Sequence, residues 1–286
     1  MSSLPGPDWM ASLDGGTGIW ELTVPGTHNS AARRGGPRAR TQTMGIGAQL
    51  EVGIRFFDIR LRHGAGVFRL YHGRVDQRLE FEAGVVDPMA AFLERHPGEA
   101  VVVCVRQEDR GNEGRFAGDF EALAGRRAPG FYTAPEPPRL AQARGRIVLV
   151  RRFAGSAIGI PAAGWRNDAT FRMPTPGGVL CVEDEWELAG PLPGQMAAKW
   201  SAVARHLDEA AATTTGWYLT FTSATSDFSF PRAVAGGTPG VDGMNRRLLD
   251  YLGRRPAGER LGTVVMDFPE LPDGRLIQGL IDANRP

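Results

Sequence analysis

The sequence predicts an α/β protein built as one closed (β/α) barrel of the TIM type. Apolar runs that are nearly continuous in Val, Ile, Leu and Phe recur along the chain, which is typical of strands covered on both faces. Helix-compatible stretches separate these runs, and no linker-like change of composition divides the 286 residues. Strands alternating with helices over this length favour one barrel domain spanning residues 1–286.

The elements follow from these runs in chain order. Seven barrel strands are predicted, at 19–24, 53–61, 100–106, 146–153, 178–184, 217–223 and 263–268. The stretches between them predict helices at 44–53, 87–97, 193–212, 243–256 and 274–285. Residues 64–73 are too few for a crossover helix, so we expect a hairpin arm there. The eighth barrel strand is not evident from the sequence.

Composition excludes several classes of protein. With 42% hydrophobic and 23% charged residues, the chain is neither disordered nor fibrous. Its 33 Lys and Arg residues balance 32 Asp and Glu residues, so we expect no nucleic-acid partner, and any bound anion must be held locally. Cys104 and Cys181 lie in apolar runs and predict buried thiols, not a disulfide or a metal site. The start of the chain shows no signal peptide, which leaves the cellular location open.

Polar side chains follow the predicted strands. A TIM barrel gathers the carboxyl ends of its strands at one mouth, so residues far apart in the sequence converge there. The residues concerned are His28, Asp58, Arg60, Arg106, Arg152, Asp184, Thr222, Ser223 and Asp267.

Two histidines at turns, His28 and His72, flank Arg60 in the sequence. One such histidine alone is more often structural than functional. The pair with an arginine matches what phosphodiester cleavage by an internal hydroxyl requires: a base for the nucleophile, a cation for the phosphoryl oxygens and an acid for the leaving alcohol.

The chain resembles a known family in a series of motifs. TVPGTHNSAA, RFFDIRLRHG, LYHG, RIVLVRRFAGS, VEDEW, YLTFTS and VVMDF, in this order, are similar to motifs of the bacterial phosphatidylinositol-specific phospholipases C. The resemblance extends from about Trp9 to Asn284. It implies a single-domain distorted TIM barrel that works without a metal or another cofactor. The implied products are diacylglycerol and inositol 1,2-cyclic phosphate, and the implied partner is phosphatidylinositol at a membrane or micelle interface. We expect a monomer.

The resemblance also implies roles for individual residues. His28 would take the proton of the inositol 2-hydroxyl, with Asp267 orienting its ring, and His72 would protonate the leaving glycerol oxygen. Arg60 would bind the phosphate oxygens, and Asp58 would hold either this arginine or the catalytic histidine in place. The positions that would bind the inositol hydroxyls are Arg106, Arg152, Asp184 and Trp186.

The chain departs from the family pattern at three of its site positions. Asn29 replaces an aspartate that supports the arginine and the acid. An amide keeps the hydrogen bond but loses the charge, which would make His72 a weaker or differently tuned acid. Arg106 replaces a lysine and Trp186 a tyrosine, which could shift headgroup selectivity. Asparagine after the histidine also occurs in calcium-dependent relatives, but those enzymes have a carboxylate where Arg60 stands, and a cation there repels Ca²⁺.

Two alternatives remain open. One is a protein that binds an inositol phosphate headgroup without turning it over, and the other is a related phosphodiesterase with another lipid substrate, such as a glycosyl-phosphatidylinositol anchor. The basic stretch RRGGPRAR at 33–40 is either a contact for lipid phosphates beside the mouth or a solvated loop.

Overall fold

The computed structural model describes residues 6–108, 113–127, 130–190, 192–227, 229–256 and 258–285. All seven predicted barrel strands have a counterpart, although the first is displaced along the chain. They are β1 (Val24–Thr27), β2 (Phe56–Gly64), β5 (Val101–Gln107), β7 (Ile147–Arg152), β10 (Gly178–Asp184), β11 (Trp217–Phe221) and β14 (Thr263–Met266).

These seven strands are parallel neighbours in the order β7-β5-β2-β1-β14-β11-β10. At one edge of the sheet, β6 (Phe131–Tyr132) and β8 (Ile160–Pro161) pair with β7; at the other, β9 (Ala169–Thr175) pairs antiparallel with β10. The α/β barrel of TIM type is confirmed, but no ladder joins its two edges within the described ranges. The chain between β7 and β10 forms the two-residue parallel strand β8, which pairs with β7, and the antiparallel strand β9, which pairs with β10. Neither strand pairs with both edges, so the barrel stays open.

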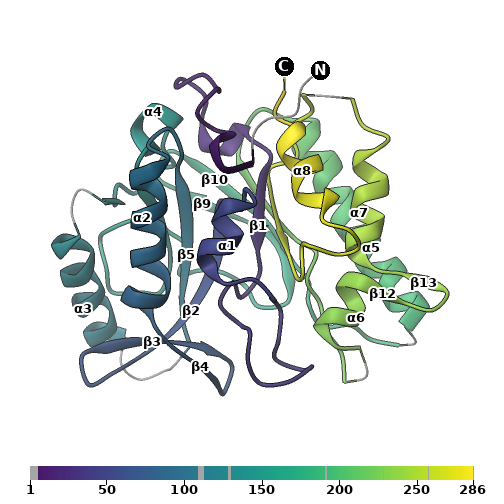
Figure 1. The fold of residues 1–286 in the computed structure, drawn as a ribbon, viewed down its shortest axis with the longest axis horizontal. Helices are drawn as coiled ribbons and strands as arrows, with labels where there is room; N and C mark the ends of the chain where they lie inside the picture. Colours follow the sequence, from purple (N-terminus) through teal and green to yellow (C-terminus); the bar gives the residue numbers. More distant parts are fainter. Residues whose placement is uncertain are drawn as a thin grey trace.

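Helices cover the outside of this sheet (Figure 1). All five predicted helices are present with slightly different ends, as α1 (Ile46–Glu51), α2 (Asp87–Arg95), α5 (Leu192–Ala211), α7 (Met244–Leu252) and α8 (Arg275–Asp282). Helix α8 illustrates why they pack, since it buries Leu276, Ile277, Leu280 and Ile281 along one face. The sequence analysis missed α3 (Glu113–Arg126), α4 (Leu140–Ala143) and α6 (Pro231–Gly236).

The predicted strand at 19–24 is wrong over most of its length. Ile19–Glu21 form a 3₁₀ turn, η2, in which the Ile19 amide donates to the Pro138 carbonyl, and β1 begins only at Val24, which is paired with Thr263. A short apolar run does not by itself distinguish a strand from another buried segment. Two further short helices are η1 (Gly6–Asp8) and the π-helical η3 (Glu82–Val86).

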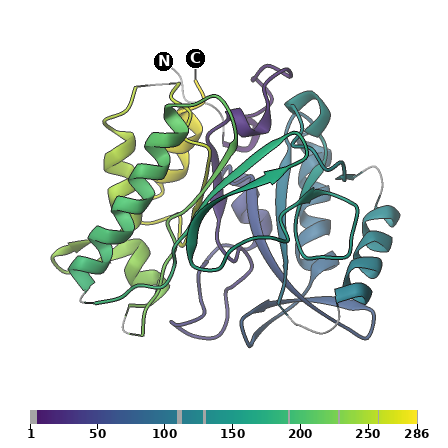
Figure 2. The same ribbon diagram turned by 180° about the vertical axis from the view of Figure 1, so that it is seen from behind.

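The hairpin arm is confirmed. Strand β2 turns back into β3 (Val67–His72), which pairs antiparallel with both β2 and β4 (Val75–Glu80). The β3–β4 hairpin, α6 and the loop after β1 lie at the same end of the molecule, opposite the two termini (Figure 1). Seen from behind, the hairpin of β9 and β10 lies between α5 and α3 (Figure 2). The parallel strands therefore deliver their carboxyl ends to the end where the β3–β4 hairpin lies.

The strands form the core as their continuous apolar pattern predicts. Each residue from Val101 to Val105 is at most 1% exposed. Cys104 and Cys181 are confirmed as buried free thiols. No helix in the described ranges is long and apolar enough to cross a bilayer.

His206, on α5, should make stability fall in mild acid. Its Nδ1 lies 2.8 Å from Thr220 Oγ1, and burial, with a smaller contribution from Arg172, lowers the pKa of His206 to about 3. In the unfolded chain the pKa is about 6.5, so between pH 6.5 and pH 3 only the unfolded chain binds this proton. Stability is full above pH 6.5 and decreases as the pH falls, by about 2 kcal/mol from this residue between pH 7 and pH 5.

Urea unfolding at pH 7 and pH 5 measures this prediction. Each protein loses free energy of unfolding between pH 7 and pH 5. In His206→Gln this loss should be smaller than in the parent protein by about 2 kcal/mol, whatever the stability of the variant at pH 7. An equal loss in both proteins would contradict it. Since all other titrating groups are the same in both proteins, the difference isolates His206.

Candidate active site

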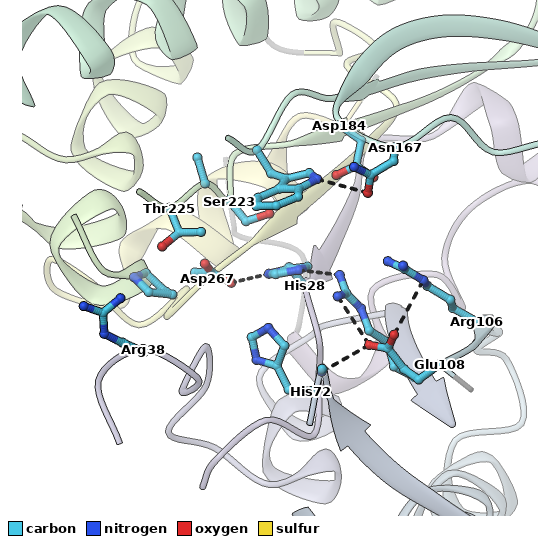
Figure 3. A pocket seen from close by; sticks show the side chains of 15 residues that line it. His28, Arg38, His72, Arg106, Glu108, Asn167, Asp184, Ser223, Thr225 and Asp267 are labelled. Carbon is cyan, nitrogen blue, oxygen red and sulfur yellow. Dashed lines mark hydrogen bonds and ion pairs between the residues drawn. The ribbon is translucent and has the colours of Figure 1, made fainter. Parts of the chain in front are cut away.

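A cavity of about 250 Å³ opens at the carboxyl ends of the parallel strands. Figure 3 shows its lining side chains, most of which come from the ends of β1, β2, β3, β5, β10, β11 and β14 or from the residues just after them. Arg38 comes from the loop between β1 and α1, Asn167 from the segment before β9, and Pro231 from α6. Eight of the chemistry-bearing residues singled out in the sequence line it: His28, Arg60, His72, Arg106, Asp184, Trp186, Ser223 and Asp267. The convergence of strand ends that the barrel predicts therefore occurs.

His28 lies between an acid and a cation. Its Nδ1 is 2.8 Å from Asp267 Oδ1, and its Nε2 is 2.7 Å from Arg60 Nη2. Because a guanidinium can only donate, Nε2 must accept, and we assign the proton of the neutral ring to Nδ1, bonded to Asp267. Burial raises the pKa of Asp267, an effect that His28 partly reverses. The ring thus presents the lone pair of Nε2 toward the pocket, as a general base requires.

Arg60 is held by buried carboxylates. Both its Nε and its Nη2 lie 3.3 Å from Asp58 Oδ2, and Nη1 is 3.7 Å from Glu108 Oε1. Burial alone would raise the pKa of Asp58, but Arg60, Arg152 and His28 overcome it and hold that pKa well below its usual value. Asp58 is therefore ionised at neutral pH, and it holds the guanidinium beside His28.

His72 faces His28 across the pocket. The two ring centroids are 6.2 Å apart, with the planes at 85°. His72 Nδ1 lies 2.7 Å from the Ala39 carbonyl oxygen, to which it must donate, leaving Nε2 without the proton in the neutral ring. Burial, and after it the positive charge of Arg60, lower the pKa of His72 to about 3. The imidazole is neutral in the free protein.

Asp184 and Trp186 follow β10 on the far side of the pocket from His72. Asp184 Oδ2 accepts a 2.8 Å hydrogen bond from Trp165 Nε1 and is 3.8 Å from Arg152 Nη2. The Arg152 guanidinium lies 3.8 Å from the centroid of the Trp165 ring. Arg152 does not line the pocket. It contacts the site indirectly, through ion pairs with Asp184 and Asp58. Trp165, a residue to which the sequence analysis assigns no role, contacts both Asp184 and Arg152.

Glu108 is a pocket residue that the sequence analysis missed. Its carboxylate faces Arg60 and, at 3.9 Å, Arg106 Nε, and it accepts the Gly73 amide at 3.3 Å. It stands two residues after Arg106, and side chains two apart on an extended chain share a face, which is the signal that could have found it. Asn167 and Thr225 also line the pocket without a predicted role.

Asn29 does not line the cavity. Its side chain is buried, its Nδ2 has no hydrogen-bond partner among the described residues, and its backbone amide donates to Asp58 Oδ2 at 3.1 Å. The structure thus connects Asn29 to the site through Asp58. The support for His72 comes from Ala39 instead. No group of three or more His, Cys, Asp or Glu side chains in the described ranges is placed to hold a metal ion.

Comparisons with known proteins agree with these motifs. Residues 19–133 match the family model PI-PLC X 1. A 1-phosphatidylinositol phosphodiesterase of Listeria monocytogenes is 26% identical over 283 residues, covering 94% of this chain and 83% of that protein. The chain is thus similar, over most of its length, to a bacterial phosphatidylinositol phosphodiesterase. A second member of this group, from Staphylococcus aureus, is 30% identical over 203 residues, which cover 63% of this chain and 64% of that protein.

Solved structures of these bacterial phosphodiesterases share the fold. The phosphatidylinositol-specific phospholipase C of S. aureus, in a structure concerned with membrane binding, superposes with a TM-score of 0.85 at 23% identity, and both chains are covered completely. The L. monocytogenes enzyme superposes with a TM-score of 0.76 at 24% identity, over 99% of this chain and 100% of that one. The open barrel is therefore the fold of this group.

Proposed function

We propose that the chain is a phosphatidylinositol-specific phospholipase C that releases diacylglycerol and inositol 1,2-cyclic phosphate. The similarity to 1-phosphatidylinositol phosphodiesterases supports the substrate class. The observation that carries the mechanism is the placement of His28, paired with Asp267 and in contact with Arg60, opposite His72 in one pocket. The substrate would be met at a membrane or micelle interface, by a monomer.

The first half of the reaction is the attack. In this proposal His28 Nε2 removes the proton of the inositol 2-hydroxyl, and that oxygen forms a bond to phosphorus as the bond to the glycerol oxygen breaks. Asp267 stabilises the resulting imidazolium through the Nδ1 proton. Arg60 leaves Nε2 to the substrate hydroxyl and binds the phosphoryl oxygens, whose growing negative charge it neutralises.

The second half is protonation of the leaving glycerol oxygen by His72. A neutral His72 cannot donate from Nε2, so the proton must be taken up when substrate binds. The anionic phosphodiester favours this uptake because a negative charge nearby raises the pKa of an imidazole, and the Ala39 carbonyl accepts the Nδ1 proton in either charge state. Asn29 carries no charge where the family has an aspartate, so in this proposal the protonation of His72 depends more strongly on bound substrate.

For the inositol ring, we propose Asp184 and Glu108 as hydrogen-bond acceptors and Arg106 as a donor, since all three line the pocket. Trp186 offers a flat apolar surface to the ring, and Arg152 holds Asp184. Asn29 would act through Asp58. The guanidinium of Arg60 supplies the charge neutralisation that a metal ion supplies in other phosphodiesterases, so we expect no metal requirement.

Phosphorus NMR of phosphatidylinositol micelles with the protein, in the presence and absence of EDTA, tests the proposal. We expect the resonance of a five-membered cyclic phosphate to appear at the same rate with and without chelator. Phosphatidylcholine micelles serve as the control and should give no product. Saturable binding of the headgroup without any product would instead favour a binding protein. We expect product, because a protein that only binds the headgroup has no use for a carboxylate that orients an imidazole. Loss of the product with EDTA would contradict metal independence.

A further inference from the structure

The backbones that carry His28 and Asp267 leave the sheet just before these two residues. Strands β1 and β14 are paired in register up to Thr27 and Met266. His28 and Asp267 are the residues that follow, and the His28 amide still donates to the Met266 carbonyl at 2.9 Å. Beyond that bond the pairing of the two strands no longer fixes the two backbones relative to each other. The geometry of the His28–Asp267 pair therefore depends on contacts from outside these strands.

Each residue of the pair is followed by one in a strained conformation. Asn29 has φ +44° and Phe268 has φ +43°, both in the left-handed region that residues other than glycine seldom adopt. Such a conformation costs free energy and persists only where surrounding contacts hold it. The segments that carry His28 and Asp267 therefore need support at this point.

Gln42 supports the first of these segments. Its side chain comes from the loop between β1 and α1, and it is fully buried. Gln42 Nε2 donates to the His28 carbonyl at 2.8 Å and to the Met266 carbonyl at 3.1 Å. An amide nitrogen has two N–H donors, so both are used. One buried side chain thus ties the residue after β1 to the last residue of β14.

Asn245 supports the second segment in the same way. It lies in the first turn of α7 and is also fully buried. Its Nδ2 donates to the Asp267 carbonyl at 3.0 Å and to the Phe268 carbonyl at 2.8 Å. Helix α7 is thereby attached to the carboxylate residue that contacts the His28 ring and to the strained residue after it.

The oxygen atoms of the two amides are not used. Gln42 Oε1 and Asn245 Oδ1 are buried, and neither has a hydrogen-bond partner in the described ranges. A buried oxygen without a partner costs free energy, and both amides bear this cost while their nitrogens bind the backbone. What the two side chains contribute is therefore a pair of donors on each segment that carries the His28–Asp267 pair.

We propose that Gln42 and Asn245 are positioning residues, whose nitrogens hold the two backbones in the geometry that a general base requires. With both backbones tied, His28 Nδ1 and Asp267 Oδ1 stay 2.8 Å apart, and the ring keeps the tautomer with the proton on Nδ1 (Figure 3). Neither amide lines the pocket, so each acts through the pair. The inference rests on the proposed function, in which His28 is the base, and a displacement of about 1 Å costs such a group about 10²-fold in rate.

The kinetics of apolar variants test this proposal. Gln42→Met and Asn245→Leu remove the donors, and we expect kcat for phosphatidylinositol to fall by about 10²-fold while KM stays within about threefold. The matched control is Asn284→Leu. Asn284 Nδ2 donates to the Thr23 carbonyl at 2.7 Å and to the Ile281 carbonyl at 3.1 Å, at the end of β1 away from the pocket. This variant should keep kcat within about threefold of wild type, whatever stability it loses.

Nitrogen NMR of the substrate-free protein gives a second readout, which a merely structural role would not change. The shifts of the His28 ring nitrogens, measured where the ring is neutral, report which of them carries the proton. In wild type and in Asn284→Leu we expect the proton on Nδ1. In Gln42→Met and Asn245→Leu we expect the proton to be shared between Nδ1 and Nε2, because the carboxylate is no longer held against the ring.

The two readouts separate a failure of the inference from a failure of the proposed function. If wild type cleaves phosphatidylinositol and the folded variants retain both its kcat and its ring shifts, the amides do not position the pair. A loss of kcat in Asn284→Leu equal to theirs would also contradict the proposal, because the loss of any amide bridge would then suffice. If wild type releases no product, the proposed function is wrong, and the ring shifts alone decide whether the amides hold the pair.

Thermal unfolding checks that each variant folds. Should an apolar variant not fold, Gln42→Glu or Asn245→Asp takes its place, since each keeps the size of the side chain and removes at least one of the two donors. The same two readouts then decide the proposal.

Discussion

His28→Ala lowers kcat/KM for phosphatidylinositol by about 10³- to 10⁴-fold, at the upper end of what one acid or base contributes. The variant lacks the proposed base for the hydroxyl proton. It also lacks the ring that contacts both Arg60 and Asp267. Release of cyclic phosphate from mixed micelles, followed by phosphorus NMR, measures the loss. Near wild-type turnover would show that the reaction does not use this imidazole as its base.

The control for this variant is His96→Ala. His96 Nδ1 lies 2.7 Å from Asp8 Oδ1 outside the pocket, so its replacement removes an imidazole and a carboxylate contact of the same kind without touching the site. We expect His96→Ala to keep turnover within about threefold of wild type, since substitutions remote from a site seldom disturb its chemistry. Thermal unfolding of both variants checks that the fold is retained.

His72→Ala should lose about 10²- to 10⁴-fold in kcat/KM on phosphatidylinositol, and the loss should depend on the leaving group. Glycerol is a poor leaving group without a proton. A nitrophenyl ester of inositol phosphate releases a stable anion and needs no acid, so His72→Ala should reduce its cleavage by less than about tenfold. Initial rates on both substrates, followed by phosphorus NMR and by absorbance, make the comparison.

His28→Ala serves as the control for the leaving-group test. A base acts on the attacking hydroxyl whatever group departs, so the nitrophenyl substrate should not restore the activity of that variant. If the two variants lose equally on both substrates, the division of roles between the imidazoles is wrong.

The residues at strand ends were the most predictable part of the site. His28, Arg60, Asp184 and Asp267 each follow an apolar run, and the barrel brings such positions to one mouth whatever the details of the loops. Residue type then indicated the chemistry, because few proteins place two histidines beside an arginine without a use for them.

The contacts made by irregular segments could not be predicted in this way. The Ala39 carbonyl reaches His72 only because of the path that the loop after β1 takes, which depends on its packing against Gln77 and Val75. Trp165 reaches Arg152 and Asp184 from a segment without regular structure between β8 and β9. The open edge of the barrel could not be predicted either. The period of the apolar pattern does not say whether the edge strand, here β9, runs parallel to its neighbour or returns as a hairpin.

In the proposed mechanism, the contact between Arg60 and His28 Nε2 would make the pocket selective for charge. While the guanidinium occupies that nitrogen, a sugar without phosphate would have no means of drawing it away, and the lone pair of the proposed base would stay engaged. A phosphodiester would offer the arginine a stronger acceptor and free the imidazole as it binds. His28 would then act as a base only toward molecules that carry the bond to be broken, and uncharged polyols would not activate it.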